Sequence, residues 1–329
     1  MIFSEGSGVG DSIYGNWQAP IRMFLESQEQ AYEQESVLLQ IYGEQESKHW
    51  AESYTGLTGF GTFEPVGENG AYPQAEVEQG YDKTIINETW KNSFAISREM
   101  VDDDTVGVFK QRPAGFMKSY SATREEFGAA LLAGASAGST AVTYKGRSFN
   151  AACADGLALF SKVHPGKVSK KTQSNLFSNA LTAENLGKAE TAMQNFRGDN
   201  DELLAIAPKT IVIPNIASLK KAAFEAVGSV DDPASSNNAW NYQYGRWNII
   251  VWPYLNQFLA SGAEPWFLLD KEYSDLAATL IWQNRVELEV KSVIAENDAN
   301  VWKGYARFGA GFGDWRGIAV GGVTGGTAL

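Results

Sequence analysis

Residues 155–165 read DGLALFSKVHP, and they form the most distinctive stretch of this chain. Asp155-Gly156 is a turn signal, so the stretch should begin with a turn and continue as a loop. Ser161 and His164 suggest a hydrolase, but no Gly-x-Ser-x-Gly elbow surrounds the serine. Residues this close in sequence also seldom face each other across a site. We therefore interpret His164 as a structural residue of the loop and keep a hydrolase that uses Ser161 and His164 as an alternative.

The chain after this stretch predicts helices and strands in alternation. Thr182 can cap a helix that runs to Phe196, because its side chain can accept a hydrogen bond from the first turn. The apolar run 211–213, bounded by prolines, predicts a buried strand. Residues 286–290 alternate between apolar and acidic side chains, as in a strand with one buried face. Further elements are expected as a helix at 215–227, a polar loop at 231–238, and strands at 247–252, 266–269, 302–308 and 315–320.

Two long helices are predicted before this stretch. Residues 116–137 carry alanines at packing positions, which would let another backbone approach closely. Pro113 marks a break or a new start in front of them. Residues 21–42 have apolar side chains at helical spacing, with Gly43 as the stop. The Gly/Ser-rich residues 1–19 predict a flexible arm.

The segment 54–97 has a different character. Six glycines and two prolines between residues 54 and 82 oppose a helix, and aromatic side chains lie among them. Residues 83–96 then have the composition of a strand, so we expect a β-hairpin arm over 54–97. A monomeric enzyme rarely extends so much aromatic-bearing chain, because exposed apolar patches promote association. The simplest explanation is that other copies of the chain cover it.

The composition indicates a folded, acidic protein. Its 329 residues include 44% hydrophobic side chains and 12% aromatics, which excludes a disordered chain. The formal net charge of −12 gives no general electrostatic reason to bind DNA or an anionic membrane. The single cysteine, Cys153, cannot form an internal disulfide, and two histidines are too few for a His-rich metal site. No secretory signal and no apolar run of roughly 20 residues is present, so no membrane partner is expected.

Smaller motifs are better explained by structure than by chemistry. Residues 309–313 (GAGFG) lack the helix that must follow a dinucleotide-binding loop. Residues 102–104 (DDD) lack the spaced ligands of a calcium loop. Cys153 lies among alanines and should be a small packed side chain. The segment 167–171 carries three lysines without an aromatic platform for nucleic acid, so we interpret it as a solvated face. We predict no catalytic residue, no cofactor and no metal.

Residues 155–165 resemble the DG-x-x-LFS-x-x-HP segment of Mu-like phage major head subunits. Further pieces resemble that family in the same order: Asn175 with the helix from Thr182, residues 203–214 with the helix to Val227, Asn238, residues 247–253, and residues 266–270. The resemblance covers residues 83–320 in pattern and is sharpest from 155 to 270. Lys162-Val163 departs from it by replacing smaller residues, and residues 1–50 match no part of the family.

The resemblance implies the HK97 capsid fold, an α+β fold in which an N-terminal arm and an extended β-hairpin, the E-loop, reach over neighbouring subunits. A peripheral P-domain carries a long spine helix, and an axial A-domain packs around the five- and six-fold centres. The implied parts of this chain are the N-terminal arm at 1–45, the E-loop hairpin at 46–97, the P-domain at 98–180 with its spine helix at about 116–137, the A-domain at 181–284, and return strands of the P-domain at 285–329.

The function implied by the resemblance is that of the major capsid protein of a tailed double-stranded DNA bacteriophage. Its main partner would be itself, in pentamers and hexamers of an icosahedral shell that assembles in the host cytoplasm and encloses the genome in the virion. Portal, scaffold or decoration proteins would be further partners. The packaged DNA would lie inside without sequence-specific binding, since the chain is acidic. An encapsulin-like nanocompartment shell is the alternative with the same fold, and the hydrolase is the third.

Four aromatic residues of the hairpin are our candidates for inter-subunit contacts: Phe60, Phe63, Tyr72 and Tyr81. Aromatic side chains carry interface energy well, because they bury a large area at a low cost in conformational entropy. The alternative is that these rings fold back on their own subunit.

Overall fold

The computed structural model describes residues 2–4, 15–58, 63, 65–68, 70–74, 77–103, 108–228 and 240–329. The fold is α+β, and the chain divides into two compact units. Unit 1 is Met1–Glu52, Ile85–Gly128 and Trp282–Ala310; unit 2 is Ser53–Thr84, Ala129–Ile281 and Gly311–Leu329. Three sequence expectations fall wholly or largely outside the described residues: Phe60, the polar loop at 231–238, and the arm at 1–19.

Unit 1 is built on one mixed sheet. Its strands follow the order β1 (Ile2–Ser4), β13 (Leu280–Ile294), β14 (Asn300–Phe312) and β5 (Glu88–Ile96), and β2 (Gly43–Glu46) also pairs with β13. The strands predicted at 286–290 and 302–308 lie within β13 and β14, which are longer. The glycines at 309–313 mostly continue β14, and so they do not form a phosphate-binding loop.

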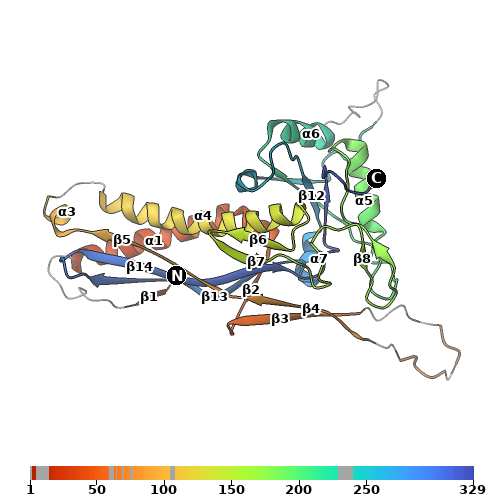
Figure 1. Ribbon diagram of the computed structural model, residues 1–329, viewed down its shortest axis with the longest axis horizontal. Helices are drawn as coiled ribbons and strands as arrows, with labels where there is room; N and C mark the ends of the chain where they lie inside the picture. Colours follow the sequence, from red (N-terminus) through yellow and green to blue (C-terminus); the bar gives the residue numbers. More distant parts are fainter. Residues whose placement is uncertain are drawn as a thin grey trace. The chain divides into compact units, whose positions relative to one another are not determined.

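Among the described residues, four helices belong wholly or partly to unit 1: α1 (Gly15–Glu35), α2 (Val37–Ile41), α3 (Arg98–Asp102) and α4 (Val108–Ser136). Figure 1 shows α4 running along the sheet of β5, β14 and β13. The helix predicted over 21–42 breaks at Ser36, because Ser36 caps α2 and also donates to the buried carboxylate of Glu125. The helix predicted over 116–137 begins earlier, at Val108, and continues through Pro113 in its second turn.

Aromatic rings fill the space between α4 and the sheet. Trp90 of β5 stacks on Phe308 of β14 with ring centroids 4.8 Å apart, and Trp282 lies 4.9 Å from the same ring. A glycine allows α4 to come close, since a Cβ on Gly304 would lie 2.4 Å from the ring of Phe116. The core of unit 1 therefore depends on large rings from three strands and one small residue beneath the helix.

Unit 2 contains a four-stranded sheet in the order β11 (Asn248–Trp252), β10 (Thr210–Pro214), β12 (Trp266–Leu269) and β15 (Ile318–Gly321). β10 is parallel to β11, and the other two pairings are antiparallel. The helices of this unit are α5 (Ala183–Gln194), α6 (Ala217–Gly228), the 3-10 helix η1 (Pro253–Gln257) and α7 (Lys271–Leu276). Thr182 caps α5 through its side chain, as the sequence predicted.

In the part of the chain that the structure describes, three two-stranded ladders complete the fold: β3 (Ala51–Leu57) with β4 (Gln79–Ile86), β6 (Ala141–Tyr144) with β7 (Arg147–Asn150), and β8 (His164–Pro165) with β9 (Thr172–Gln173). The Ala/Gly-rich end of α4 packs closely on the second ladder, because a Cβ on Gly134 would lie 2.3 Å from Val142. The sequence predicted close approach at the alanines of this helix, and the structure shows it at Gly134 beside them.

The strand predicted over 83–96 is divided at Asn87. Its backbone N–H donates to Trp50 O at 2.9 Å, and its side chain donates to Ser47 Oγ at 2.8 Å. β4 therefore pairs with β3, whereas β5 joins the sheet of unit 1. The protruding hairpin is narrower than the predicted 54–97 and consists of β3, β4 and the residues between them. β15 likewise pairs with β12, so the final strand does not return to the sheet of unit 1.

Candidate functional site

The stretch 155–165 folds around a buried pair of side chains. The carboxylate of Asp155 accepts a hydrogen bond from Leu157 N at 3.0 Å, and Gly156 has φ +82°, which makes the predicted Asp-Gly turn. His164 Nδ1 donates to the other oxygen of Asp155 at 2.6 Å, and both side chains are buried. The stretch is thus closed on itself by its first and its second-to-last residues.

Ser161 and His164 are not hydrogen-bonded to each other. His164 Nε2 lies 3.3 Å from Leu159 O, so both ring nitrogens have partners other than the serine. The hydroxyl of Ser161 accepts from Val163 N at 3.3 Å. The imidazole ring is fully buried and stacks on Trp315. These contacts agree with the interpretation of His164 as a structural residue of the loop.

Asn175 connects this stretch to the end of the chain. Its buried amide group donates to Leu159 O at 2.8 Å and to Ile318 O at 3.1 Å, and its side-chain oxygen accepts from Ser161 N at 3.0 Å. A single side chain thereby satisfies backbone groups of two segments that are far apart in sequence, the stretch 155–165 and the start of β15. The resemblance included Asn175, but spacing alone gave no indication of this role.

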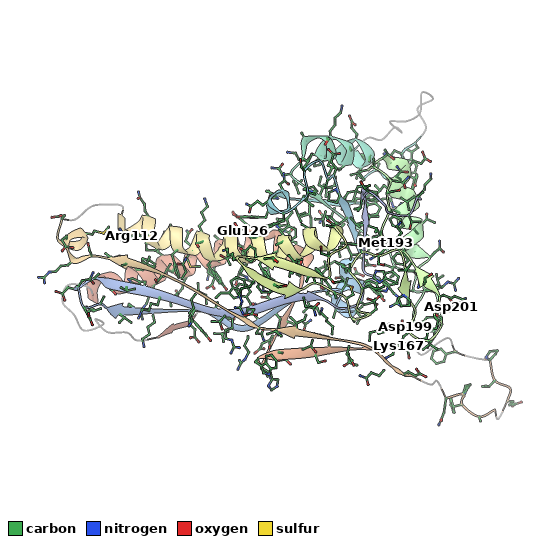
Figure 2. The ribbon with its side chains drawn as sticks, in the orientation of Figure 1. Arg112, Glu126, Lys167, Met193, Asp199 and Asp201 are labelled. Atoms are coloured by element: carbon green, nitrogen blue, oxygen red, sulfur yellow. The ribbon has the colours of Figure 1, made fainter. Side chains whose placement is uncertain are left out.

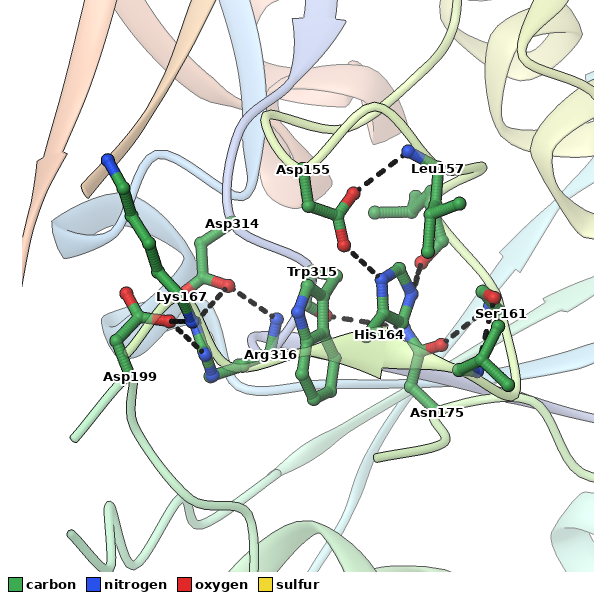
Figure 3. Close-up of polar contacts among 12 residues, drawn as sticks. Asp155, Leu157, Ser161, His164, Lys167, Asn175, Asp199, Asp314, Trp315 and Arg316 are labelled. Atoms are coloured by element: carbon green, nitrogen blue, oxygen red, sulfur yellow. Dashed lines mark hydrogen bonds and ion pairs between the residues drawn. The ribbon is translucent and has the colours of Figure 1, made fainter. Parts of the chain in front are cut away.

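A second buried network lies beside the first one, as Figure 3 shows. The guanidinium group of Arg316 donates to Asp199 at 2.8 Å and to Asp314 at 3.0 Å, and it lies over the ring of Trp315. Burial alone would lower the pKa of Arg316, but the charges of Asp314 and Asp199 outweigh it and raise that pKa. The cation therefore stays charged and holds the two carboxylates in place.

This network reaches the hairpin through Lys167. The backbone N–H of Lys167 donates to Asp199 at 3.1 Å. Its ammonium group donates to the carbonyls of Gln79 and Gly80, at 2.5 Å each, and lies 5.4 Å from the centre of the Tyr81 ring. Figure 2 labels Lys167 and Asp199 close together beside the hairpin. Lys167 was predicted to be part of a solvated face, and its role depends on a contact that sequence spacing does not reveal.

Lys83 is a second anchor of the same ladder. Its ammonium group is buried and donates to Asn150 Oδ1 at 3.1 Å and to Ala152 O at 2.5 Å. Neither of these acceptors carries a charge, so burial lowers the pKa of Lys83. The β3–β4 ladder is therefore held to its own unit by one lysine from β4 and one from the loop after β8.

The ladder itself is tight at its outer end. A Cβ on Gly80 would lie 2.8 Å from the backbone of Gly56, so only glycine allows the two strands to approach this closely. Beyond them, Thr58 N donates to Glu78 O at 3.0 Å, and Glu78 N donates to Thr58 Oγ1 at 2.8 Å. These paired contacts fix the strands up to the point where the hairpin tip begins.

The hairpin tip, defined here as the described residues 63, 65–68 and 70–74, is exposed to solvent. Phe63 is fully exposed and Tyr72 is 95% exposed. Tyr81 differs from them, since its ring is half-buried beneath Lys167. Of the four predicted contact residues, the structure therefore leaves Phe63 and Tyr72 uncovered within the chain, while Phe60 lies outside the described residues.

The cysteine and the basic segment singled out in the sequence both make contacts within the chain. Cys153 is buried, as predicted, and burial raises the pKa of its thiol well above the ordinary value. Lys171 forms an ion pair with Asp201, so this lysine of the basic segment, like Lys167, binds residues of its own chain. In the part of the chain that the structure describes, no group of three or more His, Cys, Asp or Glu side chains could hold a metal ion. None of the helices described is both long and apolar enough for a membrane crossing.

Comparison with known proteins gives the family. The phage capsid protein family model matches residues 80–321. No curated protein matches the sequence. The chain is similar to the capsid of Ralstonia phage GP4, with TM-score 0.51, 10% identity and coverage of 85% of this chain and 86% of that one. It is also similar to the capsid of cyanophage P-SCSP1u, with TM-score 0.50, 10% identity and 85% coverage of both. A procapsid chain of bacteriophage JBD30 aligns with TM-score 0.46 and 18% identity, over 92% of this chain and 75% of that one.

The likenesses to the GP4 and P-SCSP1u capsids confirm the predicted α+β, HK97-like capsid fold. The narrower resemblance to Mu-like head subunits stays a prediction. The family match covers most of the chain and includes the stretch 155–165, the second anchor residue Lys83 and the four strands of the unit 2 sheet. The chain belongs to the phage capsid protein family.

Proposed function

We propose that many copies of this chain, as the major capsid protein of a tailed bacteriophage, assemble into pentamers and hexamers of an icosahedral shell that encloses double-stranded DNA. The observation that supports this most directly is the hairpin. Its ladder is fixed to its own unit by Lys83 and Lys167, yet its tip presents Phe63 and Tyr72 to solvent. A rigid support for two uncovered aromatic rings suits a contact with another molecule.

The energetic role of the tip follows from its area. An aromatic side chain buries roughly 150–250 Å², which corresponds to roughly 4 to 6 kcal/mol per ring before the costs of association. In a shell the same contact is repeated by every copy. Modest interfaces therefore add up to a stable particle, and the tip would act as the arm that links each subunit to a neighbour.

The parts of the subunit take their roles from this proposal. The ladder of β3 and β4 with its tip is the E-loop, narrower than 46–97. The part of unit 1 after residue 45 is the P-domain, with α4 as its spine helix. The sheet of β10, β11, β12 and β15 with α5 and α6 is the A-domain. Residues 1–45 form the N-terminal arm, of which α1 and α2 pack on their own subunit through Tyr32 and Ser36.

The chain would act as a structural protein and not as an enzyme. The two nitrogens of His164 have structural partners, and Ser161 has no part in them. Portal, scaffold and decoration proteins would be additional partners in the virion, and the genome would lie inside without sequence-specific binding. If the shells enclosed an enzyme cargo in place of nucleic acid, the chain would instead form a nanocompartment.

The test is to shorten the hairpin without disturbing its ladder. Residues 59–77 are replaced by Asn-Gly, a sequence that closes a tight hairpin, so the pairing of Thr58 with Glu78 is kept. Purified wild-type protein should form closed shells in electron micrographs. The shortened subunit should have the circular dichroism spectrum of the wild type but form no closed shells. Normal shells from the shortened subunit would refute the proposed role of the hairpin.

A further inference from the structure

One side chain from a distant segment binds the first residues of β4. The ammonium group of Lys167 contacts three consecutive residues, since it donates to the carbonyls of Gln79 and Gly80 and lies over the ring of Tyr81. Gln79 and Gly80 lie 88 and 87 positions from Lys167 in the sequence. An ammonium group suits this position, because it has three hydrogens to donate and a cation is attracted to an aromatic face.

Lys167 is itself held from the interior of unit 2. Its N–H donates to Asp199, whose carboxylate accepts from Arg316 at 2.8 Å. The Arg316 guanidinium lies 4.9 Å from the centre of the Trp315 ring, and that ring stacks on His164. Figure 3 shows Lys167, Asp199 and Arg316 joined in this order. The lysine that binds the hairpin is therefore itself bound to the buried network of Arg316.

Lys167 also acts at a particular place along the hairpin. Gln79 is the first residue of β4, and just beyond it Thr58 pairs with Glu78. Lys83, by contrast, anchors the strand further from the tip. Lys167 thus contacts the ladder at its outer end, at the first three residues of β4.

We propose that Lys167 is a positioning residue for shell assembly: its ammonium group fixes the outer end of the β3–β4 ladder and thereby sets the direction in which Phe63 and Tyr72 leave the subunit. The proposal rests on the proposed function of the hairpin tip. Loss of the ammonium group leaves the fold intact, because the networks of Asn175 and Arg316 do not need it. It frees the end of the ladder, and tips that point in variable directions join neighbouring subunits less often.

Two readouts on matched variants test this role. Lys167→Met keeps an unbranched side chain of similar length but removes the ammonium donors, and Lys167→Arg keeps a charged donor. Lys162→Met is a control at an exposed lysine five positions away. Hydrogen exchange at the amides of residues 79–81 should be about tenfold faster in Lys167→Met, the range expected for a lost hydrogen bond to a charged group. Exchange should be close to wild type in the other two. The yield of closed shells should fall in Lys167→Met alone.

The outcomes separate the two proposals. If the amides of residues 79–81 exchange at the wild-type rate in Lys167→Met, Lys167 does not fix the end of the ladder. If they exchange faster but the yield of closed shells is normal, Lys167 has no positioning role in assembly. Equal loss of shells in Lys167→Arg and Lys167→Met would show that the charged donor is not what matters and would also overturn it. If wild-type protein forms no shells, the proposed function fails, while the exchange rates still decide whether Lys167 fixes the ladder. If Lys167→Met does not fold, Lys167→Gln replaces it with the same readouts.

Discussion

The imidazole ring of His164 lies flat on the indole ring of Trp315, with their centroids 4.4 Å apart and their planes 6° from parallel. One ring belongs to the loop that begins at Asp155, and the other precedes β15 near the end of the chain. The stack places a histidine that resembles a catalytic residue in the interior of unit 2, next to the ion pairs of Arg316. From there the contacts continue through Asp199 and Lys167 to the hairpin.

The partner that holds His164 should be important for stability. Asp155→Ala leaves Nδ1 of a fully buried ring without its acceptor, so the free energy of unfolding should fall by about 3 kcal/mol. Ser161→Ala is the control and should cost less than about 1 kcal/mol, since its hydroxyl only accepts from Val163 N. Urea denaturation followed by tryptophan fluorescence measures both. Equal effects of the two substitutions would contradict the structural role of the Asp155–His164 pair.

Gly304 should be intolerant of a side chain. Gly304→Ala places a Cβ 2.4 Å from the Phe116 ring, and relieving that clash between α4 and β14 should cost about 1 to 3 kcal/mol of stability. Gly115→Ala on α4 is the matched control, because nothing lies within 4 Å of its Cβ and alanine favours helix. That control should leave stability unchanged or raise it by up to about 1 kcal/mol. A thermal unfolding midpoint for Gly304→Ala equal to that of the wild type would disprove the close approach.

Lys83 should make stability depend on pH in a predictable direction. Burial lowers the pKa of Lys83 below its ordinary value of 10.5, so between these two values the unfolded chain binds more protons than the folded one. Within that window the free energy of unfolding of the wild type should rise with pH relative to Lys83→Met. Below the lowered pKa the burial cost is fully present.

Denaturation of wild type, Lys83→Met and Lys162→Met at neutral pH and near the upper end of that window checks this. The exposed Lys162 should give no such trend relative to the wild type. A difference between wild type and Lys83→Met that stays constant with pH would mean that Lys83 is not desolvated.

The thiol of Cys153 should be inert in the folded protein. It is buried, and its pKa is raised, so little of the reactive thiolate forms at neutral pH. A colorimetric thiol reagent should react with it only after denaturation in urea. Rapid reaction of the native subunit would show that this side chain is accessible.

Local signals in the sequence were sufficient for many elements of the fold. The cap at Thr182 and the alternation at 286–290 predicted α5 and part of β13, because capping and one-sided burial act within a few residues. The break at Ser36 could not be predicted in this way. It depends on the carboxylate of Glu125, which lies 89 residues away and accepts hydrogen bonds at the start of α2.

The candidate site was predicted in outline but not in its contacts. The aromatic, glycine-rich composition indicated a protruding hairpin, and the resemblance of the stretch 155–165 to phage head subunits indicated the family. The division at Asn87 depends on Trp50 and Ser47, and the role of Lys167 depends on carbonyls of β4. Backbone carbonyls have no sequence signature, so a lysine that binds them looks like any other lysine in the sequence.

The two exposed aromatic rings should matter for assembly and not for the fold. Phe63→Ala with Tyr72→Ala should leave the unfolding midpoint of the subunit unchanged, since neither ring is covered within the chain. The same double substitution should reduce the yield of closed shells at least tenfold, because roughly 4 to 6 kcal/mol of gross burial is lost per ring. Phe63→Tyr with Tyr72→Phe keeps both rings and should assemble normally. Sedimentation velocity measures the fraction of subunits in shells.

The most direct measurement is a cryo-electron microscopy reconstruction of shells assembled from the wild-type protein. It should show Phe63 and Tyr72 of each subunit covered by a neighbouring copy, with the β3–β4 ladder still held by Lys83 and Lys167 of its own chain. A reconstruction in which both rings remain in solvent, or fold back against their own subunit, would contradict the account.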